Sequence, residues 1–136
     1  MIGQARILAS PLAMAGVAGA VVDGMWRQPR LLDDDPDKEG EAIDADNLET
    51  LRTLMRSVIT SGTGTALASV AGEPIGKSGT AEYEDGDPPP THGWFIAARE
   101  DVAVAVIVED MASGGEFAAP IAATFLSAIE TEDPAP

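Results

Sequence analysis

Cysteine is absent from the sequence, and aromatic residues make up only 4% of its 136 positions. The absence of cysteine excludes disulfides and thiolate metal sites. Because 45% of the residues are hydrophobic but few are aromatic, a core in this chain must consist mainly of small aliphatic side chains. A chain of this length suits one domain with a modest core.

Basic residues are also scarce. Lys and Arg together number 8, against 23 Asp and Glu, which gives a formal net charge of -15. Binding to DNA or RNA relies on clustered Lys and Arg, so this charge argues against a nucleic-acid partner.

A long hydrophobic run is missing as well. The longest apolar stretch, residues 7–22, falls short of the ~20 residues that a membrane-spanning helix needs. It is also a poor match to a signal peptide, because no basic segment precedes it. We expect a buried helix here, with Ser10 as N-cap and Pro11 at the first helical position. The alternative is a small-residue face packed inside a membrane.

Acidic residues dominate the segment 33–46, which we interpret as a solvated loop. Its alternating Asp35, Asp37 and Glu39 resemble the start of a calcium-binding loop. However, the twelfth loop position holds Asp46 in place of the usual Glu, and no helix precedes the segment. The sequence therefore predicts no metal site here and no cofactor.

Helical spacing of apolar residues marks two further segments. Residues 47–61 predict a helix with Asp46 as N-cap and Gly62 as its stop. Residues 115–130 predict a last helix. The apolar stripes are Leu48, Leu51, Leu54, Met55, Val58 and Ile59 in the first, and Phe117, Ile121, Phe125 and Ile129 in the second.

Strands are expected between these two helices. A short turn joins the second and third candidates, so these two should pair antiparallel. The order of elements predicts an α+β fold, in which helices cover an antiparallel sheet of three strands. We assign residues 1–131 to this domain and 132–136 to a disordered tail. The three strand candidates are residues 76–84, 92–98 and 102–109.

The stretch "AGEPIGKSGTAEY", residues 71–83, allows two interpretations. A phosphate-binding loop would need a helix that begins at Lys77 and Ser78, but Gly79 and the prolines at 88–90 exclude a long one. A strand places Lys77 and Gly79 on one face and Ser78 and Thr80 on the other. Such a strand offers a cation and hydroxyls to a carboxylate. Alternatively, the lysine only protects a sheet edge from aggregation.

Several motifs resemble the C-terminal part of the transpeptidase domain of penicillin-binding proteins, most closely the class B type. They occur in the order and rough spacing of that family and cover nearly everything except the acidic loop and the tail. Ser10 stands where the family commonly has Thr, and Ser78 replaces the commoner Thr. The motifs are "IGQARILASPLAMAGVAGAVVDG", "LRTLMRSVITSGTGTAL", "GKSGTAEY", "HGWFIA", "VAVAVIVED" and "GGEFAAPIAATFL".

The resemblance implies a penicillin-binding, serine β-lactamase-like fold and a cell-wall function. Lys77 would orient the substrate, and the hydroxyls of Ser78 and Thr80 would contact the carboxylate of a peptidoglycan stem peptide or a β-lactam. Gly79 lets a ligand approach the backbone closely, and the N–H of Thr80 would be an oxyanion donor. The location implied is the cell envelope, outside the cytoplasm.

Two of the three motifs of that family are missing. Asn47 is the only asparagine and follows Ala45 by two positions, so Ser-x-Asn is absent. We therefore expect a C-terminal portion that lacks the nucleophile, is inactive alone and needs an upstream half. The alternative is a non-catalytic remnant or interaction module. Ser-x-x-Lys is also absent, since none of the serines has a lysine three positions later: Ser10, Ser57, Ser61, Ser69, Ser78, Ser113 and Ser127.

The single histidine, His92, lies beside Trp94 in a predicted strand. A catalytic base needs a nucleophile within reach, and the sequence near His92 offers none. We interpret His92 as a structural strand residue.

Overall fold

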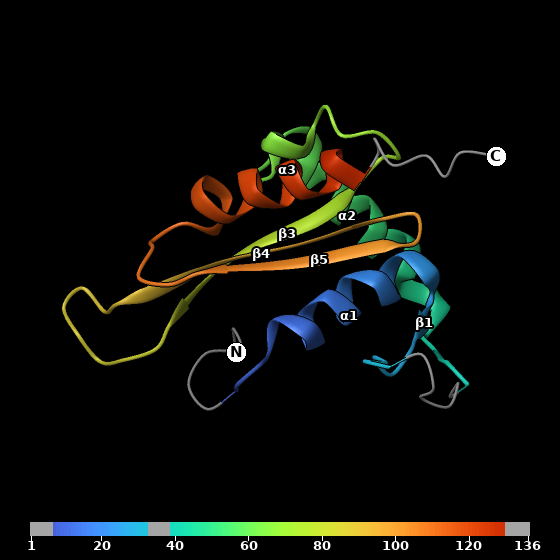
Figure 1. The fold of residues 1–136 in the computed structure, drawn as a ribbon, viewed down its shortest axis with the longest axis horizontal. Coiled ribbons are helices and arrows are strands. Elements are labelled where there is room, and N and C mark those ends of the chain that lie inside the picture. Colours follow the sequence, from blue (N-terminus) through green and yellow to red (C-terminus); the bar gives the residue numbers. More distant parts are fainter. Residues whose placement is uncertain (1–6, 33–38, 130–136) are drawn as a thin grey trace.

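The computed structural model describes residues 7–32 and 39–129. Helix α3 covers one face of a three-stranded sheet, α1 covers the other face, and α2 lies beside the first strand (Figure 1). This arrangement confirms the predicted α+β fold. The elements are α1 (Pro11–Asp23), β1 (Met25–Trp26), β2 (Glu41–Ala42), η1 (Ala45–Asn47), α2 (Leu48–Thr60), η2 (Thr65–Leu67), β3 (Ile75–Glu82), β4 (Thr91–Arg99), β5 (Val102–Val108), η3 (Gly114–Ala118) and α3 (Ala119–Ile129).

The sheet has the strand order β3-β4-β5, and both pairs are antiparallel. All three predicted strands are confirmed, with small shifts at their ends. The pairing places Gly79 opposite Trp94 and Trp94 opposite Ile107. The β4–β5 turn contains Glu100 at φ 48, a left-handed conformation that lets two residues close the hairpin.

Helix α1 begins as the sequence predicts. The Ser10 Oγ accepts a hydrogen bond from the Ala13 N–H at 3.1 Å, and Pro11 occupies the first helical position. Gly24, at φ 81, ends the helix by donating its N–H to the Ala20 carbonyl at 2.8 Å. A residue with a Cβ would be strained at that φ, which is why glycine stands there.

Only one face of α1 is buried, so the prediction of a buried helix holds in part. Ala18 and Val21 pack against Ile96 on β4, whereas Leu12 is 50% exposed and Val17 is 42% exposed. A run that is apolar on all sides cannot reveal which side meets the sheet. None of the helices in the described part of the chain is long and apolar enough to cross a membrane.

Helix α2 begins one residue later than predicted. Asn47 is its N-cap in place of Asp46, because the short 3-10 turn η1 precedes the helix and includes Asp46. Leu48 is buried, but Leu51 is 41% exposed and Leu54 is 58% exposed. The predicted apolar stripe is therefore only partly covered.

The acidic segment contains more structure than predicted. Within the predicted loop 33–46, the two residues of β2 pair with β1, and Met25 lies opposite Ala42. The predicted tail 132–136, the domain boundary at 131 and residues 33–38 lie outside the described residues.

The last helix packs with a different face from the one predicted. Phe117, Ile121 and Phe125 are 38%, 50% and 45% exposed. The chain begins this region with the π-helical turn η3 and continues into α3. Small side chains allow the helix to lie close to the sheet, and Phe117, Ile121 and Phe125 point outward. The buried residues are Ala118, Ala119, Ala122 and Leu126.

Gly114 marks the closest approach between η3 and the sheet. A Cβ at this position would overlap the carbonyl oxygens of Trp94 and Gly79. Gly93 faces the same contact, since a Cβ there would lie 3.2 Å from the Gly114 nitrogen. Glycine is therefore required for the segment before α3 to cross the strands.

Replacing Gly114 with Ala should lower the free energy of unfolding by about 1–3 kcal/mol, because backbone atoms cannot rotate away from the added methyl group. Gly19→Ala is the control: its Cβ would lie 3.4 Å from the Ala103 Cβ, and Ala is the better helix former. Urea unfolding followed by circular dichroism measures both variants. Equal midpoints for the two would contradict the tight packing at Gly114.

Candidate functional site

The four predicted site residues are consecutive on β3. Lys77 and Gly79 pair with Ile96 and Trp94 and share the sheet face that carries α1. Ser78 and Thr80 belong to the opposite face, which carries α3. Lys77 and Thr80 are exposed, and Ser78 and Gly79 are half-buried.

Both hydroxyls of this run have partners within the protein. The Ser78 Oγ and the Thr63 Oγ1 are hydrogen-bonded at 2.7 Å, and the Thr80 Oγ1 donates to the Ala112 carbonyl at 3.2 Å. The Lys77 ammonium donates to the carbonyl of Ser78. Thr63 lies in the loop after α2, and nothing in the sequence linked it to β3. A ligand at this strand would meet Ser78 and Thr63 as a pair of hydroxyls.

Two cavities, of about 490 and 520 Å³, are lined in part by residues of α1, and the larger of these two lies against β3. Among the described residues that line this cavity, Lys77 is the charged one. Apolar walls with a cation at one side suit a ligand that carries a carboxylate on a largely apolar frame. The lining consists of residues 77–81 of β3 with Ile7, Ala9, Met14, Trp94 and Ile96.

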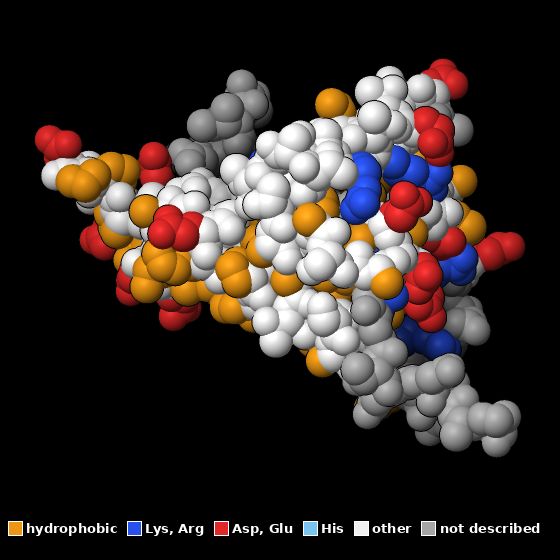
Figure 2. All heavy atoms as spheres, turned by 90° about the horizontal axis from the view of Figure 1, so that it is seen from above, with side chains coloured by type: hydrophobic (Ala, Val, Ile, Leu, Met, Phe, Trp, Pro, Cys, Tyr) orange, Lys and Arg blue, Asp and Glu red, His pale blue; other side chains and the backbone are white. Residues whose placement is uncertain are grey.

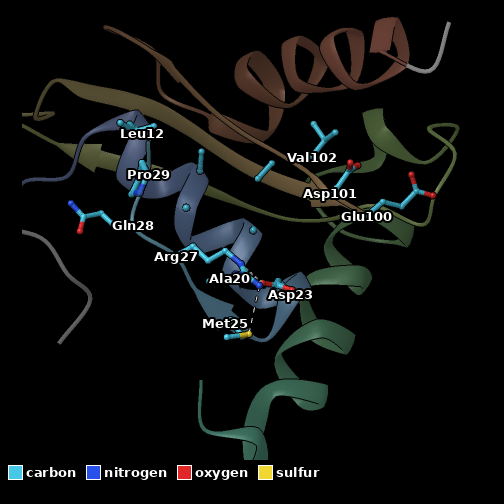
Figure 3. Close-up of a pocket in the computed structure, with 14 residues that line it drawn as sticks. Leu12, Ala20, Asp23, Met25, Arg27, Gln28, Pro29, Glu100, Asp101 and Val102 are labelled. Atoms are coloured by element: carbon cyan, nitrogen blue, oxygen red, sulfur yellow. Dashed lines mark hydrogen bonds and ion pairs between the residues drawn. The ribbon is translucent and has the colours of Figure 1, made fainter. Parts of the chain in front are cut away.

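The second cavity, of about 490 Å³, lies between α1 and the start of β5, away from the predicted site residues (Figure 3). Small residues of α1 line it, and Val102 lies at its β5 side. Asp23 and Arg27 form a salt bridge of 3.0 Å at its edge, and Glu100 and Asp101 add acidic side chains from the β4–β5 turn. No serine or threonine of the described residues lines this cavity, and the one cation in its described lining, Arg27, is already paired with Asp23. It is therefore a weaker candidate for a catalytic site than the cavity beside β3.

The phosphate-loop interpretation is wrong. Strand β3 runs through Lys77 and Ser78, so no helix N-terminus is available there to bind phosphate. Within the described residues, no group of three or more His, Cys, Asp or Glu side chains could hold a metal ion. Asp35 and Asp37 of the calcium interpretation lie outside the described residues.

A comparison with models of known protein families identifies the family of the chain. Residues 1–127 match the model of the penicillin binding protein transpeptidase domain. The chain belongs to this family. The resemblance that the sequence motifs suggested is therefore confirmed.

Solved structures of transpeptidase proteins share the fold. The D,D-transpeptidase domain of a peptidoglycan glycosyltransferase from Eggerthella lenta is 29% identical over 92% of this chain, with a TM-score of 0.70. Penicillin-binding protein 2 of Pseudomonas aeruginosa, in complex with WCK 5153, is 25% identical over 97%, with a TM-score of 0.74. The Helicobacter pylori protein PBP2, solved with MreC, supports the fold alone, at 22% identity over 96% and a TM-score of 0.77.

The chain spans only 33%, 32% and 26% of these three structures, respectively. No curated protein matched the chain. The transpeptidase family is thus established for this chain, and the activity of a whole transpeptidase is a separate question.

The end of β3 holds a cluster that the sequence did not reveal. The Tyr83 ring stacks on the His92 ring, with centroids 4.1 Å apart and an interplanar angle of 15°. The Tyr83 hydroxyl donates to the Asp110 carboxylate, and the Asp110 N–H donates to the His92 Nδ1 at 3.2 Å. The hydrogen bond to Asp110 raises the pKa of Tyr83 above its usual 10.0, and the negative charges of Asp110, Glu84 and Glu109 act in the same direction.

Tyr83 is the only tyrosine, so its ionisation can be followed by absorbance at 295 nm. We expect a midpoint above pH 10 in the folded protein and a midpoint closer to 10 in Asp110→Asn. Because folding raises the pKa of Tyr83, its protonated hydroxyl stabilises the folded state. This contribution is complete below pH 10 and is lost as the pH rises through the pKa of Tyr83 in the folded protein. A wild-type midpoint at or below that of Asp110→Asn would contradict the hydrogen bond.

Proposed function

We propose that this chain is the carboxylate-binding portion of a peptidoglycan D,D-transpeptidase. The observation that carries the proposal is the run Lys77–Thr80 on an exposed strand beside an apolar cavity. Strand β3 is at the edge of the described sheet, so a carboxylate bound along that edge can be reached from both faces. Lys77 supplies a positive charge from the α1 face, and the hydroxyls of Ser78 and Thr80 can exchange their internal partners for the carboxylate from the α3 face. The ligand class is a peptidoglycan stem peptide or a β-lactam.

The reaction is acyl transfer, and this chain supplies supporting groups for it. Lys77 orients the substrate, and the backbone N–H of Thr80 stabilises negative charge on the attacked carbonyl oxygen. Gly79 has no side chain, so a ligand can lie close to the strand. No serine in the sequence has a lysine three positions later, so the nucleophile and its activating base must come from elsewhere.

The partner we infer is the remaining, upstream part of the transpeptidase domain. Strand β5 pairs on one side only within the described sheet, and its sequence "VAVAVIV" is apolar and half-buried on both faces. An uncovered strand of this kind promotes association with another chain or segment. The cavity between α1 and Val102 lies beside the same strand (Figure 3).

Apolar surface on α3 supports the same partner. Phe117, Ile121 and Phe125 recur every four residues and form an exposed apolar row, which we call the α3 stripe. Figure 2 looks down on this face: hydrophobic side chains reach the surface in its middle, and charged side chains gather towards its ends. Such a row usually marks an interface.

The location we infer is the cell envelope, outside the cytoplasm. This follows from membership of the family and from the peptidoglycan substrate, which lies there. The proposed partners do not include nucleic acid, since the net charge of -15 opposes binding to phosphate backbones.

Labelling with a fluorescent penicillin, read by denaturing electrophoresis, tests the proposal. We expect no label on the chain alone. In a mixture with the front half of a related transpeptidase domain, we expect a covalent band on the front half that depends on this chain. A band on the chain itself would show that one of its serines is a working nucleophile, and no band in any mixture would favour the non-catalytic remnant.

Lys77→Met should slow labelling of that mixture by about tenfold to a hundredfold, since a charge-assisted hydrogen bond is worth about 1.5–3 kcal/mol. Lys38→Met is the matched control, because it removes the only other lysine of the sequence. Equal rates for the two variants would exclude Lys77 from ligand binding.

A further inference from the structure

The segment 109–114, which follows β5, is bonded to the ends of β3 and β4 at several points. The Thr80 Oγ1 donates to the Ala112 carbonyl and the Thr91 Oγ1 donates to the Met111 carbonyl, each at 3.2 Å. The segment ends at Gly114, which packs on the strand backbone. Strand pairing with Gly93 places the backbone of Thr80, and this segment holds its hydroxyl.

Asp110 is the anchor of the segment. Its φ of 57 is in the left-handed region, which Asp adopts more readily than most residues other than glycine, so the chain turns sharply at this position. Two of its polar groups are used here: the N–H donates to the His92 Nδ1, and the carboxylate accepts from the Tyr83 hydroxyl. Tyr83 thus binds the side chain of Asp110, His92 binds its backbone N–H, and the two rings stack on each other.

We propose that Tyr83, His92 and Asp110 form a clamp that fixes residues 109–114 against β3 and thereby positions the Thr80 hydroxyl, and that the clamp closes only while His92 is neutral. The three are positioning residues, since none of them lines the cavity beside Lys77. The effect on ligand binding rests on the proposed function, whereas the clamp itself is a property of this chain.

The requirement for a neutral ring follows from the hydrogen bond. The His92 Nδ1 accepts from the Asp110 N–H, so the ring hydrogen must be on Nε2. Protonation of the His92 ring would put a hydrogen on Nδ1, which then could no longer accept from the Asp110 N–H, and this hydrogen bond would break. The charged groups near the stacked rings are Asp110 and Glu109 from the end of β5 and Glu84 from the β3–β4 loop. An imidazolium would attract these carboxylates, and the Asp110 carboxylate would then be drawn away from the Tyr83 hydroxyl.

Nuclear magnetic resonance of the chain alone tests the clamp between pH 5 and 8, where histidine changes charge. We expect the Nε2–H tautomer at pH 8, and backbone amide signals of Asp110 and Thr80 that shift together with the His92 ring on acidification. In His92→Asn, the amide oxygen is an acceptor close to the position of Nδ1, and the amide group does not change its charge with pH. It should preserve the amide positions of the pH 8 state and abolish the transition.

His92→Ala removes the acceptor. At pH 7.5, exchange of the Asp110 amide hydrogen should be about threefold to tenfold faster, which is the loss of one ordinary hydrogen bond. Asp101→Asn is the control for charge: it removes one carboxylate from the β4–β5 turn, away from the clamp. The shift of the Asp110 and Thr80 amide signals on acidification should persist in this variant. A Thr80 amide that ignores the His92 titration, or a transition that persists in His92→Asn, would overturn the clamp.

The pH dependence of labelling tests its link to ligand binding. In the mixture with the front half, acidification through the His92 midpoint should slow labelling with the wild-type chain more than with His92→Asn. Identical pH profiles for the two chains would overturn the positioning of Thr80. Absence of label in every mixture would refute the proposed function, and the magnetic resonance experiment would still decide the clamp.

Discussion

Antiparallel pairing of β3 with β4 is the constraint on which the candidate site depends. The register places Gly79 opposite Trp94, and this sends Lys77 to the cavity on the α1 side and Ser78 to Thr63 on the other side. A slip by one residue would exchange these faces, because side chains alternate along a strand. Strand β4 can hold the register because its residues 95–99 are buried under both helical layers.

Small residues make the two layers possible. Gly114 and Ala118 let the last helix approach one face of the sheet, and Ala18 does the same for α1 on the other. Several larger side chains of both helices are then left on the outside, as the α3 stripe and Leu12 show, whereas Leu126 is buried. The same packing that fixes β3 therefore leaves apolar surface of both helices uncovered.

Local signals in the sequence were sufficient for the elements. Ser10, Pro11 and Gly24 define α1 through backbone rules that act over a few residues, and the predicted strand 102–109 corresponds to β5. The start of α2 was missed by one residue, because Asp46 and Asn47 are both capping residues and only the preceding 3-10 turn decides between them. The family also followed from motif order, and the match over residues 1–127 confirmed it.

The sequence by itself determined the α+β class, the strand that carries Lys77–Thr80 and the absence of a Ser-x-x-Lys nucleophile, because these depend on residue type and short spacing. Only the tertiary structure decided which helix faces meet the sheet. Phe125 looks like a core residue in the sequence, yet the alanine face fits closer to the strands. The same holds for Asp110, which reaches Tyr83 and His92 only because strand pairing brings distant segments together.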